Sequence, residues 1–155
     1  MNKIQIYCDG GCQNNGQENN VGGWGVVMIF NSHIKQFWGW TIDTTNQQME
    51  LQACIQALKK LKTDEYKVEI YSDSAYLINA FNKKWLDKWE SNDWRTYDKK
   101  PVKNKKLWQE LIVLNELYDI EFYHVQGHNG NRYNEQADSL VQKAINFGYK
   151  ELFAR

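Results

Sequence analysis

Alternating and helically spaced apolar residues along the chain predict a protein of mixed α/β structure. Residues 3–8 alternate as in a strand that ends at Asp9, and the stretch 10–23, rich in Gly, Asn and Gln, is typical of a loop. Further strands are predicted at 24–30, 34–42, 68–71 and 120–125. Helical spacing predicts helices over 74–82, 107–118 and 131–147, and one that opens at the capping box Thr45-x-x-Gln48.

The order of these segments favours one sheet with both strand directions. The first three strands have short connections, which are typical of an antiparallel meander. The later strands alternate with helices, and such crossovers join parallel strands and cover the sheet with helices. We therefore expect a five-stranded mixed sheet, three antiparallel strands followed by parallel strands, flanked by helices. The length of 155 residues predicts a single domain over 1–155.

Composition excludes several classes of protein. Hydrophobic residues make up 42% and charged residues 25%, which is typical of a globular chain and not of a disordered one. No apolar run approaches the ~20 residues that a membrane span needs. Because the first strand is predicted so close to Met1, we expect no signal or transit peptide. The three cysteines form no C-x-x-C pair, which favours a reducing cytoplasm over a disulfide framework or a zinc site.

A net charge of zero conceals a basic segment at 83–106. This segment holds nine Lys or Arg residues against four acidic ones, so the rest of the chain is negative. Trp85, Trp89 and Trp94 lie within the same segment. A basic, tryptophan-rich lobe on an acidic body indicates a polyanion bound by the lobe and a cation held by the body.

Four carboxylates occupy unusual positions. Asp9 and Asp73 each follow a predicted strand, and parallel neighbours would bring them to the carboxyl edge of the sheet. Glu50 and Asp138 each head an apolar helical stripe, where an unpaired charge is costly to bury. No Lys or Arg is close to them in sequence, and Mg²⁺ prefers such oxygen ligands. Taken singly, each aspartate also fits a turn residue or a helix cap.

The segments around these carboxylates resemble the motif blocks of type 1 ribonuclease H. The matching blocks are Tyr7-Cys8-Asp9-Gly10-Gly11-Cys12, Thr44-Thr45-Asn46-Gln47-Gln48-Met49-Glu50-Leu51, Tyr71-Ser72-Asp73-Ser74, and Gly127-His128 with Asp138. The basic segment Lys99-Lys100-Pro101-Val102-Lys103-Asn104, with Leu107-Trp108, resembles the bacterial form of the family. The resemblance extends from Ile4 to about Ala144 and implies a ribonuclease H-like fold in which 83–106 is a basic helical protrusion.

The resemblance implies a role for each matched position. Asp9, Glu50, Asp73 and Asp138 would bind two Mg²⁺ ions, with Mn²⁺ as a possible substitute, and His128 would assist proton transfer or product release. The implied substrate-binding residues are Gly10, Gly11, Asn15, Thr45, Asn46, Gln47, Trp85, Trp89, Trp94, Lys99, Lys100 and Asn104. Other roles stay open, because the threonine also fits a helix cap, the tryptophans also fit packing of the lobe, and the histidine also fits a capping loop residue.

The resemblance implies a metal-dependent endoribonuclease that hydrolyses the RNA strand of RNA–DNA hybrids and leaves 5′-phosphate and 3′-hydroxyl ends. We expect it to act as a cytoplasmic monomer. Two alternatives are a non-catalytic hybrid-binding protein on the same fold, and a relative that acts on DNA, such as an integrase or junction resolvase. The complete carboxylate set argues against the first, and the ribose-reading amides with the basic lobe argue against the second.

The chain also departs from the family pattern at several positions. The loop 14–20 lacks the proline that is common after the first motif, and it is slightly longer. Asp43 stands where some relatives carry a basic residue, Ala75 where many have a polar one, and Gln47 replaces a frequent asparagine. None of these departures removes a predicted metal ligand.

Overall fold

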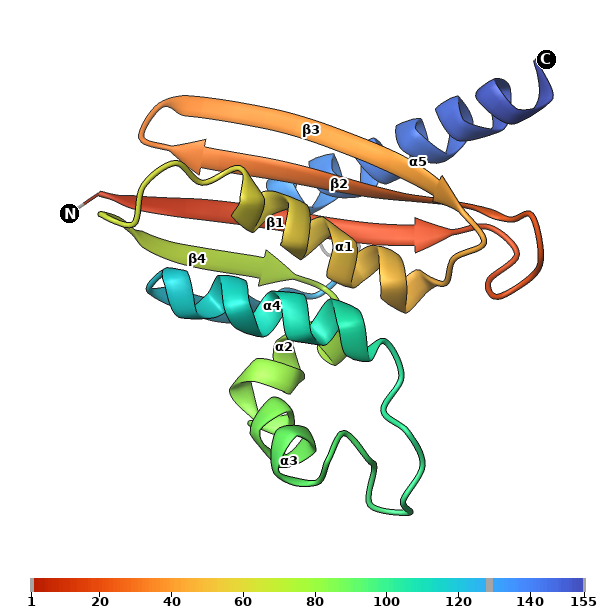
Figure 1. The fold of residues 1–155 in the computed structure, drawn as a ribbon. Helices are drawn as coiled ribbons and strands as arrows, with labels where there is room; N and C mark the ends of the chain where they lie inside the picture. The colour runs from red at the N-terminus through yellow and green to blue at the C-terminus, as the bar shows by residue number, and fades with distance from the viewer. Residues whose placement is uncertain (1, 128–129, 155) are drawn as a thin grey trace.

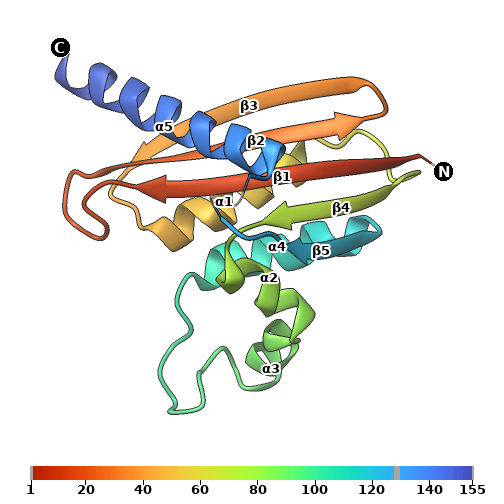
Figure 2. The same ribbon diagram turned by 180° about the vertical axis from the view of Figure 1, so that it is seen from behind.

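A computed structural model describes residues 2–127 and 130–154 of the chain. Its five strands form one sheet in the order β3-β2-β1-β4-β5 (Figures 1 and 2). β1 pairs antiparallel with β2 and parallel with β4, and the outer pairs are β2–β3 antiparallel and β4–β5 parallel. The predicted mixed sheet is confirmed. The strands are β1 (Lys3–Cys12), β2 (Val21–Phe30), β3 (His33–Ile42), β4 (Lys67–Ser72) and β5 (Ile120–His124).

Helices cover both faces of this sheet. They are α1 (Asn46–Lys59), α2 (Ala75–Asn82), α3 (Trp85–Ser91), α4 (Lys105–Leu117) and α5 (Arg132–Phe153). α1 and α4 pack together on one face, and α5 crosses the opposite face over β1, β2 and β3 (Figures 1 and 2). α3 and the segment after it project away from the sheet (Figure 2). In the described parts of the chain, no helix combines the length and the apolar character that a membrane crossing requires.

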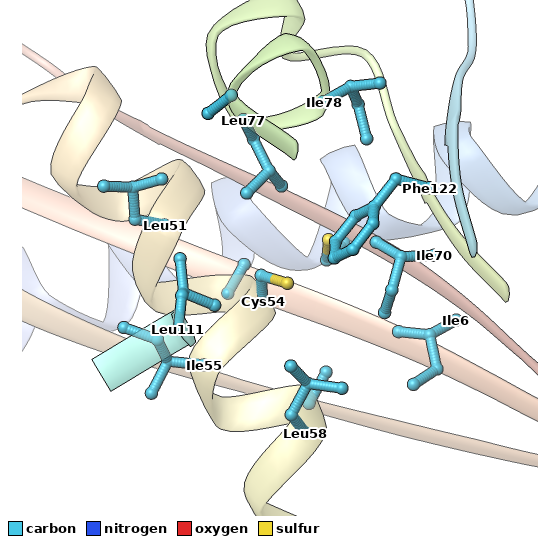
Figure 3. Packing of buried hydrophobic residues seen from close by; sticks show 14 of the residues in the cluster. Ile6, Leu51, Cys54, Ile55, Leu58, Ile70, Leu77, Ile78, Leu111 and Phe122 are labelled. Carbon is cyan, nitrogen blue, oxygen red and sulfur yellow. The ribbon is translucent and has the colours of Figure 1, made fainter. Parts of the chain in front are cut away.

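The main core lies between the sheet and the helices α1, α2 and α4. Figure 3 shows side chains of these elements packed in one cluster, among them Ile6 of β1, Ile70 of β4, Ile55 of α1 and Leu77 of α2. All four are fully buried. Burial of each such side chain stabilises the fold by ~1.5–3 kcal/mol. The apolar stripe predicted on α1 is therefore the face that packs on the sheet.

The loop predicted over 10–23 is wrong. β1 continues to Cys12 and β2 begins at Val21, so the connection covers only 13–20. The glycines that suggest a loop allow α5 to pack directly on the strands, because a Cβ on Gly23 would lie 2.8 Å from the Ala144 Cβ. Asp9 consequently lies inside β1 rather than at its end.

The carboxyl edge of the parallel strands nevertheless contains Asp9. The paired residues of β1 and β4 end with Tyr7 and Tyr71, so Asp9 follows the last parallel pair of β1. Asp73 directly follows β4, whose last residue is Ser72. The two aspartates thus meet where the sequence places them, although one of them remains within an antiparallel pair with β2.

One helix boundary differs from the prediction, and another agrees with it. α5 extends to Phe153, beyond the predicted end at 147, and its first turn is capped by Asn131 Oδ1, which accepts hydrogen bonds from the backbone N–H groups of Tyr133 and Asn134. α1 starts as predicted, because Thr45 Oγ1 accepts a hydrogen bond of 3.1 Å from the Gln48 N–H.

Candidate active site

Three carboxylates from distant parts of the chain converge at the edge of the sheet. One oxygen each of Asp9, Glu50 and Asp73 lies within 4.8 Å of the others. Asp138 of α5 lines the same hollow. The four predicted metal ligands are therefore brought together by β1, α1, the turn after β4, and α5.

Close backbone contact between β1 and α1 positions two of these groups. The Gly10 N–H donates a hydrogen bond of 2.8 Å to Glu50 Oε1. A Cβ at Gly10 would lie only 2.2 Å from the backbone carbon of Met49, so only glycine allows the strand and the helix to approach this closely. The absence of a side chain at Gly10 thus places Glu50 beside Asp9.

Short polar contacts fix the turn that carries Asp73. The Ser74 N–H donates to Ser72 Oγ at 3.0 Å, and His124 Nε2 lies 3.2 Å from the carbonyl oxygen of Asp73. Ser74 Oγ also caps α2 by accepting from the Leu77 N–H. His124 therefore supports the turn through the backbone of Asp73.

Burial and mutual repulsion dominate the electrostatics of the cluster. Burial raises the pKa of Asp9, and the negative charge of Glu50 raises it further. Burial also raises the pKa of Glu50, the charge of Asp73 adds to this, and hydrogen bonds from Gly10 N–H and Ser74 oppose it. Among the described residues, no Lys or Arg forms an ion pair with the cluster. Converging carboxylate oxygens without a cationic side chain fit a hard divalent cation.

A second hollow, of about 640 Å³, collects most of the predicted substrate-binding amides. Its lining includes residues from the loop 13–20, the start of α1 and the segment before α4. The lining residues are Asn15, Thr45, Asn46, Gln47, Gln48, Lys103 and Asn104. Asn46 lines this hollow and the carboxylate hollow, which also contains Gly10 and Gly11. The two hollows therefore share an edge at Asn46.

A hydrogen-bond chain ties this hollow to α2 and α4. Gln48 Nε2 donates to Asn104 Oδ1 at 3.2 Å, and Asn104 Nδ2 donates to the Tyr76 hydroxyl at 3.3 Å. The same hydroxyl accepts a hydrogen bond of 3.0 Å from the indole N–H of the buried Trp108. Sequence reasoning missed Tyr76 and gave Gln48 only a capping role. The position of Tyr76 near Asp73 is a local signal, but its partners are distant in sequence.

The tryptophans of the lobe pack against each other and onto the body. The Trp89 ring centroid lies 6.1 Å from that of Trp85, 6.3 Å from that of Trp94 and 5.7 Å from that of Trp108. All three lobe tryptophans are partly buried against the main core. The packing role is therefore present, and the half-exposed rings also leave surface for a ligand.

The two lobe lysines predicted to bind substrate, Lys99 and Lys100, are exposed. Lys100 Nζ lies 3.8 Å from Asp98 Oδ2. His128 lies outside the described residues. Its neighbour Gly127 borders the carboxylate cluster, because a Cβ there would lie 3.1 Å from Asp73 Oδ2.

Comparisons with known proteins agree with this geometry. The RNase H family model matches residues 1–146. Ribonuclease H of Clostridium botulinum is 47% identical over 145 residues, which cover 94% of this chain and 97% of that protein.

Among solved structures, LC9-RNase H1, a type 1 RNase H with the type 2 active-site motif, superposes with a TM-score of 0.82 at 27% identity, covering 100% of this chain and 82% of the other. LC11-RNase H1 in complex with an RNA/DNA hybrid superposes with a TM-score of 0.73 at 24% identity, over 95% of this chain and 99% of the other, which concerns the fold alone. The family match and the identity over nearly the whole chain show that this chain belongs to the ribonuclease H family.

Proposed function

We propose that the chain hydrolyses the RNA strand of RNA–DNA hybrids at the carboxylate hollow, leaving 5′-phosphate and 3′-hydroxyl ends. Family membership makes it a metal-dependent nuclease. The observation that carries the assignment of the site is the approach of Asp9, Glu50 and Asp73 to within 4.8 Å, with Asp138 on the same hollow. A protein that only bound a polyanion would gain nothing from four acids at the contact surface.

We propose that the four carboxylates bind two Mg²⁺ ions, with Mn²⁺ as a substitute. Asp9 lies within 4.8 Å of Glu50 and Asp73, and its burial together with the charges of the three other acids raises its pKa. When bound, a pair of such ions activates a water and stabilises the leaving oxygen of a phosphodiester. The carboxylates of Asp9, Glu50, Asp73 and Asp138 would hold the ions in place.

The hybrid would be held by the amide hollow and the lobe. Asn15, Thr45, Asn46, Gln47 and Asn104 present donors and acceptors that suit ribose hydroxyls and phosphates. Lys99, Lys100 and the half-exposed tryptophans of the lobe would contact the sugar–phosphate backbone. We keep His128 as the group that assists proton transfer or product release, and residues 83–106 as the binding protrusion of one domain.

The proposal includes a monomer in the cytoplasm, and the three free cysteines are consistent with a reducing compartment. The molar mass measured by light scattering at the assay concentration tests whether the protein is a monomer.

The decisive experiment is cleavage of an end-labelled RNA–DNA hybrid in Mg²⁺, beside free RNA, duplex DNA and the Asp73→Asn variant. We expect only the RNA of the hybrid to be cut, and the variant to be inactive but folded. Binding without cleavage in Mg²⁺ or Mn²⁺ would favour a binding module, and cleavage of duplex DNA would favour a DNA-acting relative.

A further inference from the structure

Asn20 is a buried polar residue at the end of the loop 13–20, directly before β2. Only 2% of it is exposed. Its side-chain Nδ2 donates to the carbonyl oxygens of Asn14, at 3.1 Å, and Thr44, at 2.8 Å. Its Oδ1 accepts from the Thr44 N–H at 2.9 Å. Both donor hydrogens and the acceptor are therefore used, as a buried amide requires.

These hydrogen bonds join two loops that carry substrate-binding residues. The loop 13–20 carries Asn15, and the segment that Thr44 begins carries Thr45 and Asn46. Asn15 Oδ1 in turn accepts a hydrogen bond of 2.7 Å from the Asn46 N–H. That second contact is exposed, whereas the contacts of Asn20 with Thr44 are buried and shielded from water. The Gly16 N–H also donates to the Thr44 carbonyl oxygen at 3.4 Å, and the Asn19 N–H donates to Asp43 Oδ1 at 2.6 Å. The amide of Asn20 adds contacts between the two loops that are shielded from water.

The backbone of the loop needs such a link. Asn14, Gly16 and Asn19 all have positive φ, at 52°, 77° and 61°, so the loop follows an irregular path. The loop contains no proline that would restrict it. The Asn14 carbonyl oxygen accepts hydrogen bonds from Asn20 Nδ2 and from the Gln17 N–H, the latter at 2.9 Å. The side chain of Asn20 therefore stabilises the turn 14–17, which contains Asn15.

We propose that Asn20 is a positioning residue for the hybrid: its side chain holds the loop 13–20 against the start of α1, so that Asn15, Thr45 and Asn46 form one binding edge. The inference rests on the proposed function. It also accounts for the longer, proline-free loop, because a buried amide supplies the restraint that proline would give.

The carboxylates are held independently of this link. Glu50 is fixed by the Gly10 N–H, and the Asp73 turn is fixed by Ser72 and His124. Loss of the Asn20 amide should therefore weaken binding of the hybrid while the chemical step is kept.

The test compares Asn20→Ala with Gln17→Ala, which removes an exposed amide from the same loop and serves as the matched control. For Asn20→Ala we expect KM for the hybrid to rise on the order of tenfold with kcat within about twofold of wild type. Amide hydrogen exchange at Thr44 and Asn46 should become faster, and the control should change neither quantity. A purely structural role would instead lower kcat in proportion to the unfolded fraction and leave KM unchanged.

A folded Asn20→Ala protein with wild-type KM overturns the inference, and so does a loss confined to kcat. If this variant is unfolded at the assay temperature, Asn20→Ser, which offers an acceptor to the Thr44 N–H, is measured by the same criteria. Wild-type protein that does not cut the hybrid would refute the proposed function instead, so the two failures are distinguishable.

Discussion

The two adjacent glycines of the first motif should respond very differently to the same added methyl group. A Cβ at Gly10 would lie 2.2 Å from the backbone carbon of Met49 and 2.5 Å from the backbone nitrogen of Glu50. A Cβ at Gly11 would lie 3.7 Å from Asn46 Oδ1 and from Val141 Cγ1, which is ordinary contact. Gly10→Ala therefore forces α1 away from β1, and Gly11→Ala does not.

The expected magnitudes follow from these contacts. Overpacking lowers the free energy of unfolding by ~1–3 kcal/mol. Because backbone atoms cannot rotate out of a clash as a side chain can, we expect a loss of ~3 kcal/mol or more for Gly10→Ala. At ~2–4 °C per kcal/mol for a chain of this size, Gly10→Ala should lower Tm by roughly 6–12 °C. Gly11→Ala removes the ~0.5–1 kcal/mol cost of glycine in a strand, so its Tm should stay the same or rise slightly.

Thermal unfolding followed by circular dichroism measures both Tm values, and hybrid cleavage is measured well below them. Folded Gly10→Ala should retain little activity, because the shift of α1 separates Glu50 from Asp9 and breaks the Gly10–Glu50 hydrogen bond. A Tm for Gly10→Ala within about 2 °C of wild type would refute the close approach of strand and helix.

Four further predictions concern the cluster, the hollow and the lobe. Asp9→Asn should raise the free energy of unfolding at pH 7 by on the order of 2 kcal/mol. Burial and the charge of Glu50 raise the pKa of Asp9 in the folded protein, so the charged carboxylate opposes folding at any pH above the unfolded pKa. The gain should vanish in thermal melts near pH 4, where the carboxyl group is largely protonated in both states. Mg²⁺ should raise the Tm of wild type but less that of Asp9→Asn. Tyr76→Phe should cost ~1–3 kcal/mol by leaving the Trp108 N–H unpaired, and equal denaturation midpoints would contradict this. Lys99→Ala with Lys100→Ala should raise KM and flatten its salt dependence without changing kcat.

Periodicity and motif spacing alone determined much of this protein. The alternation in β1, the stripe on α1 and the Thr45 cap are local features, because strands and helices impose periods that appear directly in the sequence. The four carboxylates could be selected because charged residues on apolar stripes or at strand ends are conspicuous. That the four groups lie close together was an expectation, based on the rule that parallel strands end at the same edge of a sheet.

Tertiary structure decided the rest, because the relevant contacts join residues far apart in the chain. The glycines at positions 10, 11, 22 and 23 suggest a loop in sequence, and only the structure shows α1 and α5 packed against them. Gln48, Asn104 and Tyr76 form a chain only because α4 returns beside α1 and α2. An asparagine such as Asn20 looks like an ordinary turn residue in sequence. Whether its amide is solvated or buried between two loops depends on what packs over it, and no local pattern encodes that.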